Sequence, residues 1–252
     1  MRTLLRCFGI AAILLVTAFL LAPFQLILTE AHLLRPPAIQ LLFGAGRTDQ
    51  VGTGLAATLL PAVPPQEVSA DRYKNLLERV KKGDTSVDFL ELRHAYADSP
   101  EYSSIEDSDE STKMFEAFNR KDYAEALAHA QKILDKNYVD IDAHHMSFLA
   151  YREMHDAEHA QFHQNIARNL IKSILSTGDG KSQKTAFEVI ATSEEYVILK
   201  VLGLQPGSQS LMGENGHDYD RLEAVDPETH LKVTLYFNVD RPMGHLHKIF
   251  SK

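Results

Sequence analysis

The sequence predicts an α+β fold, in which N-terminal tetratricopeptide-like antiparallel helices pack against a small C-terminal antiparallel β-sheet. The helical half rests on an internal similarity: Asp122–Leu127 and Asp156–Gln161 share one local pattern, and Ala126 and Ala160 stand 34 residues apart. That interval is the length of the tetratricopeptide repeat, a helix–turn–helix unit in which small residues let paired helices approach closely. The sheet rests on a change of period in the last third of the chain, where short strand-like runs replace helical spacing.

The first thirty residues predict a membrane anchor or a signal peptide. Arg2 and Arg6 precede an uncharged run from Cys7 to Thr29, whose 23 residues can cross a hydrocarbon core about 30 Å thick. The run exceeds the roughly 7–15 apolar residues of a cleavable signal, and Thr29-Glu30-Ala31 is a poor cleavage site. An uncleaved transmembrane helix is therefore the favoured interpretation. In both cases the arginines keep the N-terminus inside, so the remaining chain is expected in the periplasm or cell envelope.

The composition excludes several classes of protein. Cys7 is the single cysteine, so the chain forms no internal disulfide and fits an exported bacterial protein that needs none. Without Arg2 and Arg6 the 26 basic residues become 24, against 34 acidic ones, which gives a net charge near −10. Such a surface repels phosphate backbones, so we expect no nucleic-acid partner.

The chain after the anchor divides into a linker and one globular unit. Residues 31–66 are rich in proline and lack a sustained period, as is typical of a linker. Residues 67–178 form the tetratricopeptide-like helical part, and residues 179–252 form an α/β C-terminal part that belongs to the same globular unit. Six helices are expected in the helical part, at about 69–82, 86–97, 111–119, 123–134, 142–154 and 156–175.

The C-terminal part is expected to contain four strands and one helix. Apolar runs predict strands at 186–191, 209–212, 217–225 and 230–239. Residues 194–202 could form a short helix or a further strand, and the helix is favoured. Asp226-Pro227-Glu228-Thr229 is a turn suited to a hairpin between the last two strands.

From Ser69 onward, scattered motifs give the chain a resemblance to a bacterial family. They are Asp88-Phe89, Leu92-Arg93, Tyr96-Ala97, Asp122-Tyr123, Asp140-Ile141-Asp142-Ala143-His144, Phe162-His163, Gly178-Asp179-Gly180-Lys181-Ser182, Gln209-Ser210-Leu211, Gly216-His217, Tyr219-Asp220 and Tyr236-Phe237-Asn238. In this order and spacing the chain resembles the family catalogued as domain of unknown function 4919. The resemblance implies an exported or periplasmic domain with tetratricopeptide-like helices, and it implies no activity.

A candidate polar site centres on His163. This histidine shares a helical stripe with apolar residues and should face the interior, where an imidazole needs hydrogen-bond partners. His217, Tyr219 and Asp220 beside a predicted strand, and His144 on the preceding helix, are the expected partners. The alternative is that His163 only fixes packing. No catalytic residue is assigned.

Three other motifs are interpreted as structural, so no metal or cofactor is predicted. Gly178–Ser182 lacks the first glycine of a phosphate loop and follows a helix, so it is interpreted as a helix stop. His155, His159 and His163 recur every four residues, which could bind a metal, yet no catalytic glutamate accompanies them. The acidic run beginning at Asp107 departs from a calcium loop at its sixth and twelfth positions.

These observations favour a membrane-tethered or exported bacterial protein that acts as a protein- or peptide-binding scaffold. The 34-residue repeat, the N-terminal segment and the lack of a complete catalytic motif support this interpretation. The alternatives are a hydrolase or small-ligand-binding domain using the His/Asp cluster, and a purely structural component of the envelope.

Overall fold

In the computed structural model, residues 65–105 and 108–251 are described. The predicted anchor at 1–30 and nearly all of the predicted linker at 31–66 lie outside these residues. Within the described ranges, no helix combines the length and the apolar character needed to cross a membrane. Apart from Lys200–Gly203, the described residues belong to one compact unit, which holds the features described below.

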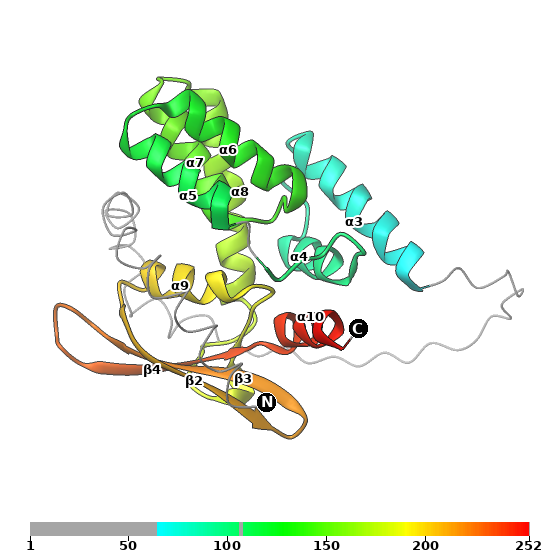
Figure 1. Ribbon diagram of the computed structural model, residues 1–252, viewed down its shortest axis with the longest axis vertical. Coiled ribbons are helices and arrows are strands. Elements are labelled where there is room, and N and C mark those ends of the chain that lie inside the picture. Colours follow the sequence, from blue (N-terminus) through cyan, green and yellow to red (C-terminus); the bar gives the residue numbers. More distant parts are fainter. Residues whose placement is uncertain (1–64, 106–107, 252) are drawn as a thin grey trace, which may run out of the picture. The chain divides into compact units, whose positions relative to one another are not determined.

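Six helices form the N-terminal part of this unit, as the sequence predicts (Figure 1). Four of them begin at an aspartate whose side chain accepts a backbone N–H in the first turn, which satisfies a donor that the helix leaves unpaired. These N-caps are Asp88, Asp122, Asp140 and Asp156. The helices are α3 (Pro65–Lys81), α4 (Phe89–Asp98), α5 (Ser108–Asn119), α6 (Tyr123–Lys136), α7 (Ile141–Glu153) and α8 (Ala157–Leu175).

The turn before α6 and the turn before α8 repeat one geometry at the 34-residue interval. Lys121 and His155 both adopt a positive φ, of 63° and 61°. The next residue, Asp122 or Asp156, donates its backbone N–H over 2.9 Å to a carbonyl five residues earlier. A left-handed residue that closes one helix just before the cap of the next makes a tight helix–turn–helix. The two turns therefore share one backbone geometry, 34 residues apart.

Small residues lie buried where these helices meet. Ala126 on α6 and Ala160 on α8 are buried, and α7 is buried along most of its length between α6 and α8. Figure 1 shows α5 to α8 packed side by side. The paired positions Met114 and Phe148 differ, because Met114 is buried and Phe148 is only half-buried. The two helix pairs are thus more alike in their turns than in their packing surfaces.

A four-stranded sheet and two helices form the C-terminal part. The strand order is β1 (Phe187–Glu188), β4 (Lys232–Asn238), β3 (His217–Val225) and β2 (Gln205–Glu214). The described elements thus confirm the α+β class. The sheet is mixed, because β1 pairs in parallel with β4, whereas β2, β3 and β4 are antiparallel. The expectation of a wholly antiparallel sheet was wrong at this one strand.

The strand expected at 186–191 is only two residues long because side chains take the backbone groups of Ile190. Its N–H donates to Glu194 Oε2 over 2.8 Å, and its carbonyl accepts the hydroxyl of Tyr102 over 2.6 Å. Backbone groups satisfied in this way are not available to a strand ladder. The chain turns instead into α9 (Thr192–Val201), the short helix predicted at 194–202.

The last helix, α10 (Asp240–Phe250), was not predicted from the sequence; it contacts β3. Pro242 and Gly244 weaken the helical pattern of this segment. Pro242 lies in the first turn, however, where a missing N–H costs nothing. Asp240 in the same turn places its negative charge at the favourable end of the helix dipole.

A buried ion pair joins the helices to the C-terminal part. Arg93 on α4 donates to Glu194 on α9 through Nη2 over 2.6 Å and through Nε over 3.1 Å. Arg93 Nη2 also donates to the Glu188 carbonyl over 3.1 Å. Arg93 is 0% exposed and Glu194 is 5% exposed. Such a fork-shaped pair fixes both the distance and the orientation of the elements that carry it.

Candidate functional site

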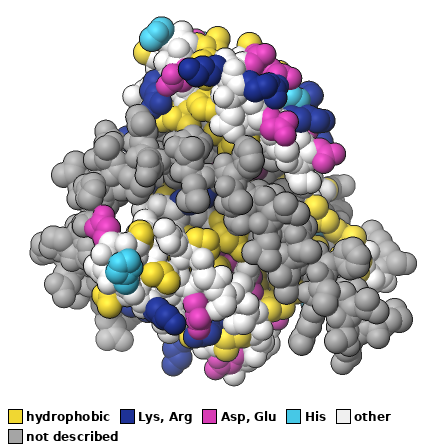
Figure 2. Space-filling model, turned by 60° about the vertical axis from the view of Figure 1, so that its left-hand side comes forward, with side chains coloured by type: hydrophobic (Ala, Val, Ile, Leu, Met, Phe, Trp, Pro, Cys, Tyr) yellow, Lys and Arg dark blue, Asp and Glu magenta, His cyan; other side chains and the backbone are white. Residues whose placement is uncertain are grey.

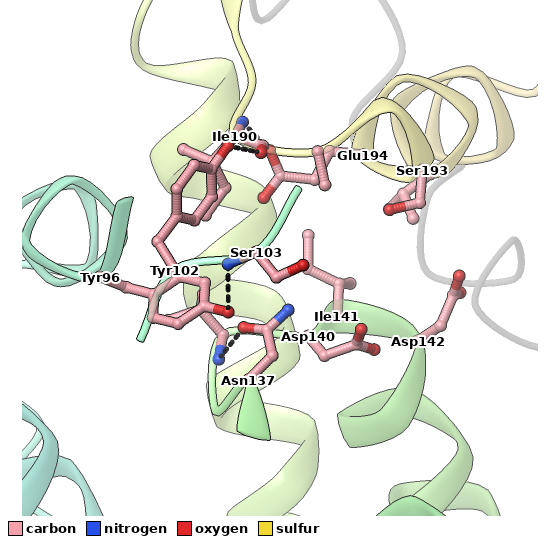
Figure 3. A pocket seen from close by; sticks show the side chains of 13 residues that line it. Tyr96, Tyr102, Ser103, Asn137, Asp140, Ile141, Asp142, Ile190, Ser193 and Glu194 are labelled. Carbon is pink, nitrogen blue, oxygen red and sulfur yellow. Dashed lines mark hydrogen bonds between the residues drawn. The ribbon is translucent and has the colours of Figure 1, made fainter. Parts of the chain in front are cut away.

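A small pocket lies where α4, the turn between α6 and α7, and the start of α9 meet (Figure 3). Its volume is about 20 Å³, which is room for one water-sized group. Figure 3 shows Tyr96 and Tyr102 on one side and Asp142 and Ser193 on the other. The lining residues are Tyr96, Tyr102, Ser103, Asn137, Val139, Asp140, Ile141, Asp142, Ile190, Ala191, Ser193, Glu194 and Val197.

Turn chemistry positions the acidic side of the pocket. Asn137 accepts the Val139 N–H over 3.2 Å and thereby holds the turn after α6. Asp140 caps α7 by accepting the Ala143 N–H over 2.8 Å. Asp142 follows in the first turn of α7. The pocket therefore receives two carboxylates from one helix start.

Two tyrosines form the opposite side. The Tyr96 hydroxyl accepts the Ser103 N–H over 3.4 Å, and the Tyr102 hydroxyl donates to the Ile190 carbonyl. Burial raises the pKa of Tyr96 to about 12 and raises the pKa of Tyr102 as well. Both phenols are therefore neutral at physiological pH and serve as hydrogen-bonding groups rather than as bases.

The charge of the pocket favours a cationic ligand. Glu194 also lines it, but Arg93 already balances that carboxylate. Asp140 and Asp142 bring two further carboxylates to the lining, and Asn137 and Ser193 add neutral hydrogen-bonding groups. A primary ammonium matches the volume, the charge and the hydrogen-bonding capacity of this lining.

Of the five predicted polar-site residues, the structure brings His144 and His163 together. Their Nδ1 atoms are 2.9 Å apart, and His144 Nε2 lies 2.9 Å from the Tyr138 carbonyl oxygen. Because a carbonyl only accepts, His144 donates from Nε2, and its Nδ1 accepts the Nδ1–H of His163. The pair is thus neutral, with both tautomers fixed by one backbone oxygen.

The burial of this histidine pair opposes its protonation. Burial, with the neighbouring His163 as a second cause, lowers the pKa of His144 to about 3. Burial likewise lowers the pKa of His163 to about 4, with the charge of His159 as a second cause. Tyr151 stacks on both His159 and His163 at 23°. The arrangement is that of a packed aromatic cluster between α7 and α8.

His217 and Tyr219 lie elsewhere, at the start of β3. His217 Nδ1 is 2.6 Å from Asp240 Oδ2, and Asp240 Oδ1 accepts the Asp218 N–H over 2.7 Å. The rings of His217 and Tyr219 are 6.2 Å apart. The His217 side chain is about half exposed. This group ties the start of α10 to β3.

Asp220 forms a third group, because alternation along β3 turns it to the face opposite His217. Gln209 Nε2 donates to Asp220 Oδ2 over 2.6 Å and to Glu195 Oε2 over 3.3 Å. The Gln209 Oε1 in turn accepts the Tyr196 hydroxyl over 2.9 Å. Burial raises the pKa of both acids, and that of Glu195 is raised well above its usual value.

The five predicted residues therefore lie in three groups, on α7 and α8, at the start of β3, and on the opposite face of β3. The lining of the pocket includes none of them. Neither the pocket nor Glu195 as a partner of Asp220 was predicted from the sequence. The available signal for Glu195 was the adjacent pair Glu194-Glu195 at the start of an apolar helix.

The motifs interpreted as structural have contacts that suit that interpretation. The N–H groups of Asp179 and Gly180, which a phosphate would need, donate to the Thr185 carbonyl. His159 Nδ1 lies 2.8 Å from Asp156 Oδ2 in the first turn of α8. No cluster of three or more metal-ligating side chains occurs in residues 65–105 and 108–251. Asp107 itself lies outside those ranges.

Comparison with known proteins identifies a family. No curated protein and no solved structure gives a significant match to the chain. The family model described as "Domain of unknown function (DUF4919)" matches residues 65–248, a span that holds the helices, the pocket and the sheet. The match covers more than two thirds of the sequence and includes every motif on which the resemblance was based. The chain therefore belongs to the DUF4919 family.

Proposed function

We propose that this protein is a membrane-tethered or exported bacterial scaffold whose tetratricopeptide-like helices bind a protein or peptide partner. The observation that carries the proposal is the acidic pocket at the start of α7, the third helix of the repeated array. The pocket takes the partner's cationic group, either a lysine side chain or an N-terminal amine. The repeated helices present that pocket on a rigid support.

The geometry of the array supports a binding role. Stacked helix pairs form extended surfaces that recognise peptides, and their turns set the curvature of those surfaces. Here two turns share one geometry at Lys121 and His155, and the pocket opens beside the turn that joins one pair to the next. The site therefore adjoins the connection between the two repeats.

The charge of the molecule agrees with a cationic ligand. The full sequence has a net charge of −8. Figure 2 shows basic and acidic side chains interspersed on the described surface, without a broad basic patch on the face displayed. A lysine-bearing partner would gain from long-range attraction as well as from the pocket.

The location outside the cytoplasm is part of the same proposal. It rests on the uncharged run from Cys7 to Thr29, which follows two arginines and is long enough to cross a bilayer. A hydrolase that uses the His/Asp cluster has less support, because the cluster's members lie in three separate groups. His163→Gln and His217→Gln variants would distinguish a site from packing.

Partner capture from native membranes tests the proposal. The full-length chain and its Asp142→Asn variant are crosslinked in washed membranes, and the captured proteins are compared. We expect a specific partner with the unaltered chain and at least about tenfold less of it with Asp142→Asn, because the pocket loses one of its carboxylates. Acetylation of the partner's amines should release it, since acetylation removes the positive charge.

Glu153→Gln is the matched control. It removes one carboxylate from the exposed end of the same helix, so it should leave capture unchanged. Equal capture by Asp142→Asn and by the unaltered chain would refute the pocket as the binding site. Recovery of no specific partner would refute the scaffold function itself, and recovery from the soluble fraction alone would refute the tether.

A further inference from the structure

Two buried acids from different elements face each other beneath the edge of the sheet. Glu195 on α9 is 0% exposed and Asp220 on β3 is 7% exposed. Gln209 Nε2 donates to Asp220 Oδ2 over 2.6 Å and to Glu195 Oε2 over 3.3 Å, so one amide brings the two carboxyl groups together. Two adjacent buried carboxyl groups with one donor between them avoid two neighbouring negative charges by sharing one proton.

The unpaired oxygen of Glu195 agrees with this assignment. Within the described residues, Glu195 Oε1 is buried and receives no hydrogen bond from a donor, whereas Oε2 accepts from Gln209. An ionised oxygen in that position would lack any compensation. A proton on this carboxyl group removes the uncompensated charge.

The neighbouring groups oppose a second negative charge at the pair. Glu194 on α9 and Asp218 on β3 add negative charge, although Arg93 balances the first of these. From β2 the pair receives the neutral amide of Gln209, and Tyr196 contributes a neutral phenol. Loss of the proton would leave two adjacent buried carboxylates held by one amide.

We propose that this shared proton is a pH-sensitive latch: it holds Gln209, and with it the start of edge strand β2, against α9, and its release at higher pH frees that segment. β2 is the outermost strand of the described sheet, so β3 is its neighbour in the strand order. Its pairing with β3 also shifts between Pro206 and Gln209. Gln209 therefore secures the strand next to its weakest point.

Hydrogen exchange tests the latch on the full-length chain. Amide exchange in residues 205–210, corrected for its intrinsic pH dependence, is compared at about pH 5 and about pH 8. We expect about tenfold less protection at the higher pH in the unaltered chain. Glu195→Gln should remain protected at both, because its amide donates to Asp220 permanently. Asp220→Asn also removes one of the two carboxyl groups, and it serves as the second variant if Glu195→Gln does not fold.

The outcomes distinguish a shared proton from a bound metal ion and from a general loosening of the strand. Glu214→Gln, an exposed change at the far end of β2, should keep the pH response of the unaltered chain. Equal protection of the unaltered chain at both pH values would overturn the latch. So would an undiminished pH response in Glu195→Gln or Asp220→Asn. If millimolar calcium restored protection at about pH 8 as fully as acid does, a metal ion rather than a proton would be the ligand, and the latch would also be overturned.

Discussion

At the scale of single residues, the contribution of an ion pair to the stability of the protein depends on whether the pair is buried or exposed. Arg93 and Glu194 are fully desolvated and satisfy each other, whereas Arg72 and Glu91 form a pair at the surface, 3.0 Å apart. Breaking a buried pair leaves an uncompensated charge, but breaking an exposed pair exchanges it for water. Breaking the buried pair should therefore lower the free energy of unfolding far more than breaking the exposed pair.

Glu194→Gln should reveal this difference. The change removes the charge that balances buried Arg93, so we expect the free energy of unfolding to fall by about 3–5 kcal/mol. Glu91→Gln, which breaks the exposed pair in the same way, should cost no more than about 1 kcal/mol. Urea denaturation followed by circular dichroism measures both. Similar losses in the two variants would contradict the assigned role of the Arg93–Glu194 pair.

At the scale of elements, the connection from α8 to β1 depends on glycine. Gly180 has a φ of +68°, and a Cβ there would lie 2.4 Å from the Phe187 ring. Its carbonyl also accepts the Tyr236 N–H over 2.8 Å, so the loop is tied directly to β4. The turn therefore needs both the left-handed backbone and the missing side chain.

Gly180→Ala should be more destabilising than Gly83→Ala. Gly83 has a similar φ of +79°, with nothing within 4 Å of where a Cβ would lie, so its substitution costs only the backbone strain of about 1–2 kcal/mol. Gly180→Ala adds the clash with Phe187, which we expect to cost a further ~1–3 kcal/mol, as overpacking usually does. Equal midpoints in urea for the two variants would show that the loop relaxes without cost.

The elements that the sequence predicted well are those specified locally. The aspartate caps and the turns at Lys121 and His155 lie next to the helices they define, so the six helices of the N-terminal part could be placed from the chain alone. The strand expected at 186–191 was predicted too long because the backbone groups of Ile190 bond to side chains instead. Its carbonyl accepts from Tyr102, which is distant in sequence, and its N–H donates to Glu194 on the next helix. Local patterns contain no record of such long-range hydrogen bonds.

The candidate site was harder to predict for the same reason. His144 and His163 were expected together, and they are, because they lie on the neighbouring helices α7 and α8. Asp220 was expected beside His163, but its partner is Glu195, across the interface between α9 and the sheet. Pairing across a sheet and a crossing helix depends on tertiary geometry that residue spacing does not contain.

At the scale of the whole molecule, two buried groups respond to pH in opposite directions. The His144–His163 pair is neutral when folded, with lowered pKa values, so unfolding takes up protons once the pH falls below the ordinary value of 6.5. Its stabilising contribution is present above that pH and is lost towards about 3 for His144. The Glu195–Asp220 pair, with raised pKa values, loses its contribution as the pH rises.

His144→Gln should weaken the acid response of the whole chain. The Gln amide can donate to the Tyr138 carbonyl and accept from His163, yet it takes up no proton between about pH 6.5 and 4. We therefore expect the fall in melting temperature over that range to be smaller than in the unaltered chain. His247→Gln, at an exposed position on α10, is the control and should not alter the fall. An unchanged acid response in His144→Gln would contradict the role given to the pair.

The two matching turns have a consequence for how a chain of this kind can change its length. Because Lys121 and His155 close their helices in the same way, and Asp122 and Asp156 open the next ones alike, the segment between them behaves as an interchangeable unit. Duplicating the 34 residues from Asp122 to His155 would reproduce both turns in phase, whereas an insertion of another length would rotate the following helix. A chain of this kind would therefore change its length in steps of 34 residues, with the sheet kept at its end.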